Sequence, residues 1–537
     1  MKRKLLTALL SGALMLTALA GCGQRIEDQS GTNSTSADGE SVARDELVFV
    51  NYRDIRDLNP HLYAGEMYAQ SILYDTLVSN TSEGYVGCLA EDWTISEDGR
   101  TYTFNIRDGV TFSDGTPCDA NAILANFNAI LENRERHTWL EMMNLLVGVS
   151  APDDDTFVIE MSEPYYPMLT ELACIRPFAM ISPNCMIDGS TKDGVNGYIG
   201  TGPYVLTDFV TDEYAVFERN ENYWGEKPAI QKITVKVIPD NQTRIMALEN
   251  GEIDLIFGKN MLDADAISQY VDSDRFTVSL SDPTSTRHIV LNTTHDILGD
   301  KAVRQALQHA TNRQAISEGI FYGLEPAADT LYSPTVPYCD VALEPYAYDM
   351  DEAARLLDEA GWTMGSDGIR VKDGQKLALD LLYNSDSVTE KTISEYLQSE
   401  YLKLGISLNI HGEEEQSYRD NMKAGNFDMV FNICWGMPYD PQSSLAAMRA
   451  PVYGDYAAQQ GLEDKAEIDQ AITDILTSTD EAERQELYTF VLTRLHEDAV
   501  YIPLTYETNK ALYTSDLKGV HFGTDQYDVD FASMYFE

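Results

Sequence analysis

The order of apolar and polar residues predicts strands and helices along most of the chain. Residues 93–95 and 101–106 alternate apolar with polar side chains on either side of a turn at residues 97–100, which is typical of a β-hairpin. Residues 121–131 repeat apolar side chains at helical spacing, and Asp119 stands where a helix cap is expected. This part of the chain is therefore predicted to combine antiparallel strands with helices.

A strand–helix–strand pattern follows and continues almost to the C-terminus. Its first unit is a strand at residues 233–238, a helix at 242–249 and a strand at 254–257. The other predicted strands are at residues 47–51, 156–161, 205–209, 289–291, 378–382, 407–410, 429–433 and 501–504, and the other predicted helices are at residues 71–78, 301–314, 350–360, 389–404 and 481–497. This alternation predicts an α/β protein.

A glycine-and-proline segment at residues 200–204 precedes one of these strands. Its spacing matches neither the GxGxxG pattern nor a Walker sequence. We therefore expect a structural turn there rather than a phosphate-binding loop.

The N-terminus has the pattern of an export signal. Basic residues at 2–4 precede an apolar run at 5–19 that is short for a mature membrane span. Residues 19–22, Leu-Ala-Gly-Cys, resemble the bacterial lipobox, in which the cysteine, here Cys22, carries the lipid. Residues 23–45 are rich in polar and small side chains and are expected to form a flexible tether.

Composition excludes several classes of function. A formal charge of −49 argues against a nucleic-acid partner. No GxSxG or HExxH motif is present, and no cysteine has a matched histidine nearby, so we do not expect an enzyme. Six cysteines besides Cys22 are scattered without a CxxC pair, which argues against structural zinc. Cys174 and Cys185 are candidates for a disulfide, and buried free thiols are the alternative.

Residues 46–537 resemble the extracellular solute-binding proteins of the peptide and nickel type, which serve ABC importers. The resemblance rests on the hairpin block at 91–115, the turn at 200–204, RNENYWG at 219–225, LENGEID at 248–254 and VRQAL at 303–307. It implies a two-lobed fold with the ligand in a cleft between the lobes. Lobe I would be residues 46–285 and 506–537, with an extra subdomain, and lobe II residues 286–505.

Within that family the likeness is to the nickel-binding branch. The strings that carry it are LNPHLY at 58–63, NRERHTWL at 133–140, SPTVPY at 333–338, WGMPYDP at 435–441 and AAQQGL at 457–462. The resemblance implies no resident cofactor, and a ligand in which nickel is held by a small carboxylate or histidine chelator. We also expect a monomer that delivers its ligand to the permease and ATPase of an importer. The lipobox-like residues 19–22 imply that it is anchored outside the cell membrane by lipid on Cys22. A dipeptide or oligopeptide binder of the same family is the alternative.

The resemblance also implies which residues line the cleft. Arg136 and Arg176 match positions that bind the carboxylates of the chelator, for which the planar guanidinium is suited. The matched lining residues are Trp139, Trp435, Tyr63, Tyr418, Tyr439 and Met67. Aromatic rings with a polar edge suit a planar chelate.

The chain departs from the nickel branch at one position. The histidine that binds the metal in that branch corresponds to Tyr453 here, and a neutral phenol is a poor ligand for nickel. The metal is then held only through its chelator, or another metal chelate or a carboxylate-rich molecule is bound. His61 and His137 lie in matched strings and are the candidate substitute ligands. Asp440, near the position of an amine-binding aspartate in the dipeptide branch, keeps the peptide alternative open.

Overall fold

The computed structural model describes residues 44–81, 84–259, 261–436 and 438–537. The predicted signal peptide, the lipid attachment at Cys22 and nearly all of the tether lie outside the described residues. Arg44–Glu537 forms one compact unit. No described helix is long and apolar enough to cross a membrane.

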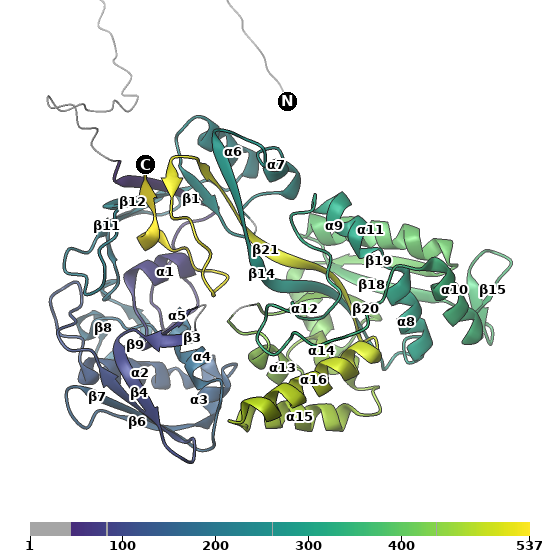
Figure 1. Cartoon of the computed structure of the whole chain (residues 1–537), viewed down its shortest axis with the longest axis horizontal. Helices are drawn as coiled ribbons and strands as arrows, with labels where there is room; N and C mark the ends of the chain where they lie inside the picture. Colours follow the sequence, from purple (N-terminus) through teal and green to yellow (C-terminus); the bar gives the residue numbers. More distant parts are fainter. Residues whose placement is uncertain (1–43, 82–83, 260, 437) are drawn as a thin grey trace, which may run out of the picture. The chain divides into compact units, whose positions relative to one another are not determined.

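Ten strands form one large sheet. In spatial order they are β10 (Tyr204–Val210), β11 (Tyr214–Arg219), β12 (Lys232–Val237), β1 (Glu46–Asn51), β13 (Leu255–Phe257), β21 (Tyr501–Thr514), β14 (Phe276–Leu291), β20 (Met429–Ile433), β18 (Ala378–Asn384) and β19 (Ser407–Glu413). Strand β1 pairs in parallel with β12 and β13, and β18 pairs in parallel with β19 and β20. The long antiparallel pair β14–β21 joins these two parallel groups (Figure 1).

The two lobe boundaries that the resemblance implies, 285/286 and 505/506, fall inside this central pair. Thr286 lies opposite Tyr506 in the register of β14 and β21. The chain thus leaves the first parallel group along β14 and returns along β21.

A second, antiparallel sheet contains the predicted hairpin. Its order is β4 (Ala90–Ile95), β5 (Thr101–Ile106), β7 (Thr156–Met161) and β6 (Leu146–Ser150). Helix α2 (Ala120–Glu132) packs on it, and the Asp119 side chain accepts a hydrogen bond from the Ala122 amide at 2.9 Å. The predicted hairpin, helix and cap are confirmed.

Short strands and the remaining helices complete the described part. The short strands are β2 (Val78–Thr81), β3 (Gly84–Gly87), β8 (Met186–Ile187), β9 (Ser190–Val195), β15 (Thr363–Met364), β16 (Arg370–Lys372), β17 (Gln375–Lys376), β22 (Leu517–Lys518) and β23 (Tyr535–Phe536). The helices are α1 (Met67–Leu73), α3 (Glu141–Leu145), α4 (Met168–Leu172), α5 (Ile175–Phe178), α6 (Asn241–Glu249), α7 (Ala264–Ser268), α8 (Lys301–Ala310), α9 (Arg313–Ile320), α10 (Met350–Glu359), α11 (Val388–Lys403), α12 (Glu415–Ala424), α13 (Gln442–Ala447), α14 (Gly454–Gln459), α15 (Lys465–Thr477) and α16 (Glu481–Glu497), with 3-10 turns η1 (Arg134–His137), η2 (Pro183–Cys185) and η3 (Phe531–Ser533).

The helix predicted at 71–78 is wrong in position, because α1 ends at Leu73. The Leu73 carbonyl accepts a hydrogen bond from the Gly202 amide at 3.0 Å instead of continuing the helix. A Cβ atom at Gly200 would overlap the same carbonyl, so the turn at 200–204 needs glycine for this close approach. The turn is confirmed as structural, and it is what ends α1.

The helix predicted at 301–314 is two helices. Helix α8 ends at Ala310, and Thr311 is extended, with φ −95° and ψ 107°. The Asn312 side chain then accepts from the Ala315 amide at 2.9 Å and caps α9. A local hydrogen bond of the capping residue therefore overrides continuous helical spacing.

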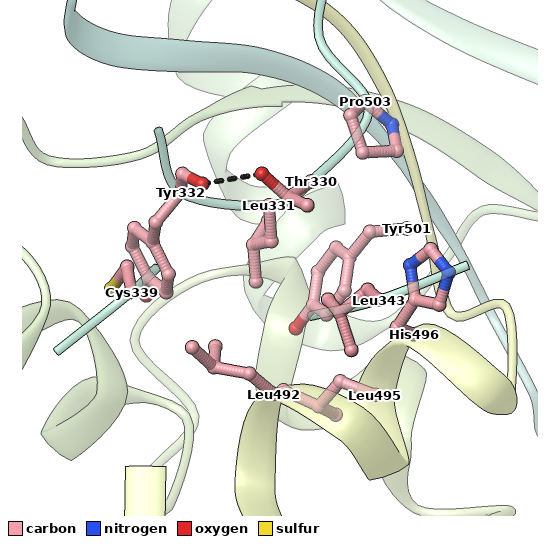
Figure 2. A pocket seen from close by; sticks show the side chains of 10 residues that line it. All are labelled: Thr330, Leu331, Tyr332, Cys339, Leu343, Leu492, Leu495, His496, Tyr501 and Pro503. Atoms are coloured by element: carbon pink, nitrogen blue, oxygen red, sulfur yellow. Dashed lines mark hydrogen bonds between the residues drawn. The ribbon is translucent and has the colours of Figure 1, made fainter. Parts of the chain in front are cut away.

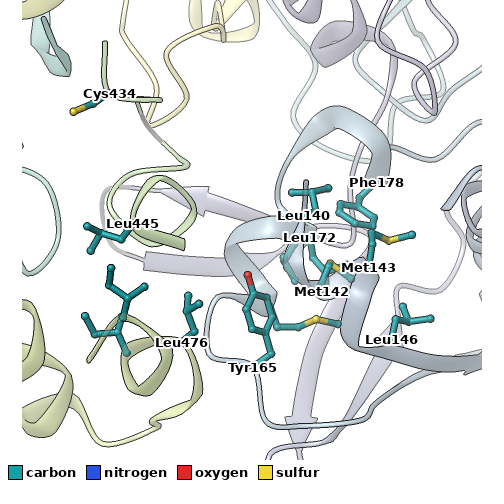
Figure 3. Close-up of a cluster of buried hydrophobic side chains, with 14 of the residues drawn as sticks. Leu140, Met142, Met143, Leu146, Tyr165, Leu172, Phe178, Cys434, Leu445 and Leu476 are labelled. Atoms are coloured by element: carbon teal, nitrogen blue, oxygen red, sulfur yellow. The ribbon is translucent and has the colours of Figure 1, made fainter. Parts of the chain in front are cut away.

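One hydrophobic cluster contains side chains from both halves of the chain. Figure 3 shows part of it, with Met142, Leu172 and Phe178 from one segment and Leu445 and Leu476 from another. The amide of Tyr166 also donates to the Leu476 carbonyl at 3.1 Å. Packing thus holds these two distant segments together.

All six described cysteines are buried free thiols, including Cys174 and Cys185. The free-thiol alternative is confirmed, and the disulfide between this pair is not formed.

Candidate ligand-binding site

Five aromatic rings from segments far apart in the sequence form one contiguous group. The Trp139 ring lies edge-to-face with Tyr63, Trp435 and Tyr439, at centroid distances of 6.1, 6.4 and 5.6 Å. Trp435 in turn lies 5.9 Å from Tyr453. We call Tyr63, Trp139, Trp435, Tyr439 and Tyr453 the aromatic group. The structure therefore brings together five of the residues that the resemblance implies.

A hydrogen-bond chain fixes two of these rings. The Trp139 indole donates to the Tyr63 hydroxyl at 2.8 Å, and that hydroxyl lies 2.6 Å from Nδ1 of His137. Burial raises the pKa of Tyr63 to about 12, so its hydroxyl stays protonated and donates a hydrogen bond to Nδ1. Burial and the charge of Arg136 lower the pKa of His137 to about 4, so its ring is a neutral acceptor at neutral pH. His137 thus orients Tyr63, and through it Trp139.

Neither candidate histidine offers a free ring nitrogen at the surface. His61 is fully buried, and its nitrogens contact the Thr191 hydroxyl at 3.0 Å and the Ala179 carbonyl at 3.2 Å. Burial lowers the pKa of His61 to about 3. Nε2 of His137 is buried and lacks a hydrogen-bond partner among the described residues. Both histidines therefore serve packing and orientation in this structure.

Arg176 is half-buried and has no acidic partner among the described residues. Its Nε donates to the Gln70 side chain at 2.6 Å, and a terminal nitrogen donates to the Gly65 carbonyl. Burial lowers its pKa, while Tyr439, Glu66 and Tyr63 act in the opposite direction without forming an ion pair or hydrogen bond with it. These contacts orient the guanidinium without neutralising it, which leaves it available to an anion.

Arg136 is an exposed cation next to the aromatic group. It lies in η1, and its charge acts on both His137 and Tyr63. Within the described part of the chain it forms no ion pair or side-chain hydrogen bond. The two matched arginines therefore supply positive charge beside the rings in a strongly acidic protein.

Met67 and Tyr418, two further residues that the resemblance implies, pack in hydrophobic clusters. Met67 opens α1 and is half-buried against the hydrophobic cluster that includes Phe49 and Tyr68. Tyr418 is buried in another cluster, and its hydroxyl donates to the Phe431 carbonyl at 2.5 Å. Tyr418 therefore has no free hydroxyl for a ligand, in contrast to the polar edge expected from the resemblance.

The C-terminal loop adds residues that the sequence did not reveal. Gln526 donates to the Trp435 carbonyl at 2.6 Å and occupies the space where a side chain at Gly436 would lie. Burial raises the pKa of the neighbouring Asp525 to about 7, and Arg176 acts to lower it. No sequence signal connects this loop to residues some ninety positions earlier; only the fold does so.

A small cavity elsewhere is too small for an organic ligand. It measures about 20 Å³ and is lined by Tyr501, Leu492 and Leu495 among others (Figure 2). That volume accommodates about one water molecule.

The chain is similar to known proteins in both sequence and structure. Residues 84–455 match the middle region of the bacterial extracellular solute-binding proteins, family 5. The chain is 41% identical over 499 residues to the nickel-binding periplasmic protein of Escherichia coli K12, covering 92% of this chain and 95% of that one. NikA from Brucella suis, solved in complex with Fe(III)-EDTA, is 44% identical with a TM-score of 0.89, covering 92% of this chain and all of the other. The dipeptide-binding protein of E. coli is 26% identical over 512 residues, covering 89% and 92%. The chain therefore belongs to the bacterial extracellular solute-binding proteins of family 5, with their two-lobed α/β fold.

Proposed function

We propose that this chain captures an anionic chelate of a transition metal, with nickel as the metal, and delivers it to an ABC importer. The observation that carries the proposal is a pair of arginines without acidic partners, Arg136 and Arg176, beside the aromatic group. Guanidinium groups bind carboxylates through parallel charge-assisted hydrogen bonds, and flat rings pack against a chelate. Two relatives support this reading, one named for nickel binding and one solved with Fe(III)-EDTA.

The metal is held through its chelator in this proposal. Tyr453 packs edge-to-face on Trp435, and a neutral phenol is a poor nickel ligand. Arg176 would bind one carboxylate of the chelator, Arg136 another, and Met67 would line the same space. A binding titration in which nickel and chelator are supplied separately and together tests the proposal.

We also propose that the protein acts as a monomer on the outer face of the cell membrane, anchored by lipid on Cys22. Cleavage after residue 21 would leave residues 23–45 as a tether to the folded body. Replacing Cys22 with Ser is expected to move the protein from the membrane fraction to the soluble extracytoplasmic fraction. A Cys22→Ser protein that stays with the membrane would contradict the anchor.

A further inference from the structure

A buried arginine on α16 is covered by aromatic rings. Arg484 is fully buried, and among the described residues no carboxylate forms an ion pair with it. Its Nη1 donates to the Ile475 carbonyl instead. The guanidinium carbon lies 3.4 Å from the centre of the Tyr166 ring, 5.0 Å from that of Tyr338 and 5.7 Å from that of Tyr488. The charge of Arg484 is therefore stabilised mainly by ring faces.

The nearest of these rings comes from the other side of the central pair β14–β21. Tyr166 lies between β7 and α4, which precede β14 in the chain, whereas Arg484, Tyr338 and Tyr488 all follow β14. The rings of Tyr338 and Tyr488 are stacked, with centroids 4.7 Å apart and planes at 9°. Arg484 and two of its rings thus belong to one lobe, and the ring that lies closest to it belongs to the other.

The main chain of Tyr166 makes a second contact across the lobes. Its amide donates to the Leu476 carbonyl at 3.1 Å. Leu476 lies in the last turn of α15, where carbonyls have no partner within the helix. Figure 3 shows Leu476 next to Tyr165, the residue before Tyr166. One end of α15 is therefore capped by an amide of the opposite lobe.

The Tyr166 hydroxyl makes a third, weaker contact. The hydroxyls of Tyr166 and Tyr338 both donate to the Glu481 carboxylate, at 2.5 and 2.6 Å. Although burial acts to raise it, these hydroxyls and Arg484 lower the pKa of Glu481, so the carboxylate is ionised at neutral pH. Glu481 is exposed, and water competes for its oxygens. The ring and the amide of Tyr166 therefore contribute more to this contact than its hydroxyl does.

We propose that Tyr166 is a latch, whose ring on Arg484 and whose amide on Leu476 hold the two lobes closed in the absence of ligand. Within the described part of the chain, no hydrogen bond, ion pair or ring contact joins these three residues to the aromatic group. The latch therefore acts whatever ligand the chain takes. It sets the fraction of ligand-free protein that is closed, and through that fraction the apparent affinity.

Small-angle X-ray scattering of the ligand-free chain from Arg44 onward tests the latch. Tyr166→Leu is expected to shift the equilibrium between closed and open forms about 3- to 30-fold towards the open form, because a desolvated cation loses its closest ring. The shift is measured as a larger radius of gyration. Tyr166→Phe keeps the ring and the amide and should stay close to the unaltered chain. Tyr456→Leu is the matched control, since it removes a half-buried tyrosine whose cation, Lys465, lies in the same lobe, and it should leave the radius unchanged.

The latch is overturned if Tyr166→Leu has the radius of gyration of the unaltered chain, or if Tyr166→Phe opens the protein as much as Tyr166→Leu does. Adding Arg484→Met to Tyr166→Leu should open the protein no further, and additive opening would contradict a shared contact. Tyr166→Leu decides the matter where Arg484→Met does not fold.

Affinity for a mixture of nickel and histidine separates the latch from the proposed function. Tyr166→Leu is expected to weaken that binding about 3- to 30-fold, in step with the loss of the closed form. Weaker binding without any change in the radius of gyration would make Tyr166 a ligand contact and overturn the latch. If the unaltered chain does not bind the mixture, the metal-chelate proposal fails, and the scattering of the ligand-free variants still decides the latch.

Discussion

Replacing Arg176 with Met is expected to weaken binding of an anionic nickel chelate by roughly 30- to 1,000-fold. Truncating one member of a buried charged pair costs about 2–4 kcal/mol, because the other charge loses its partner. The half-buried Arg176 is already oriented by Gln70 and Gly65, so its fork needs no rearrangement to meet a carboxylate. Tryptophan fluorescence titration measures the change.

Two further variants make this test specific. Arg176→Lys keeps the charge and loses the fork, so it should recover only part of the affinity. Arg355→Met removes an arginine on the exposed face of α10 and should leave affinity unchanged. Unaltered affinity in Arg176→Met, with the protein folded, would remove Arg176 from the site.

Replacing Glu507 with Gln is expected to lower the free energy of unfolding by about 3–5 kcal/mol. Glu507 is 6% exposed and lies on β21, where it accepts hydrogen bonds from Lys259 at 2.9 Å, from Ser285 at 2.6 Å and from Arg287. Neutralising it leaves the buried Arg287 and the partly buried Lys259 with only part of their charge compensation. Breaking a buried ion pair in this way is strongly destabilising. Urea unfolding measures the change.

The matched control is Glu359→Gln, which removes an exposed partner of Arg355 and should cost less than about 1 kcal/mol. Equal losses of unfolding free energy in Glu507→Gln and Glu359→Gln would show that the buried network stabilises the fold no more than an exposed ion pair does.

The stabilisation from Glu507 also depends on pH. Burial acts to raise the pKa of Glu507, but Lys259 and Arg287 hold that pKa well below its usual value. The stabilisation from Glu507 is therefore present above the unfolded pKa of about 4.3 and is lost as pH falls below it.

Much of the fold follows from local patterns. The β4–β5 hairpin and α2 rest on alternation, helical spacing and a cap, all of which lie within a few residues of one another. The misplaced helix at 71–78 depends on Gly200 and Gly202, more than a hundred residues away. The strand predicted at 289–291 is the end of a longer strand, β14, which begins at Phe276 and includes Pro283. The register shifts on both sides of Pro283 show how the sheet accommodates a residue that is unusual within a strand.

Only part of the candidate site could be predicted from the sequence. The resemblance pointed to Arg136, Arg176 and the aromatic group, but residue type alone would have assigned these rings to the core. Whether Tyr418 and His61 face a ligand or the interior depends on packing partners, and both are buried. Gln526 reaches Trp435 through the returning strand β21, and no pattern in the sequence records that contact.

The most direct test of the central claim is a fluorescence titration of the chain from Arg44 onward with nickel, with free histidine, with both together and with a dipeptide mixture. Trp139 and Trp435 lie in the aromatic group and should report occupancy. The expected result is a saturable change that requires nickel and histidine together and is lost in Arg176→Met. A response to dipeptides alone, with none to the nickel–histidine mixture, would contradict the metal-chelate proposal and assign the chain to peptide capture.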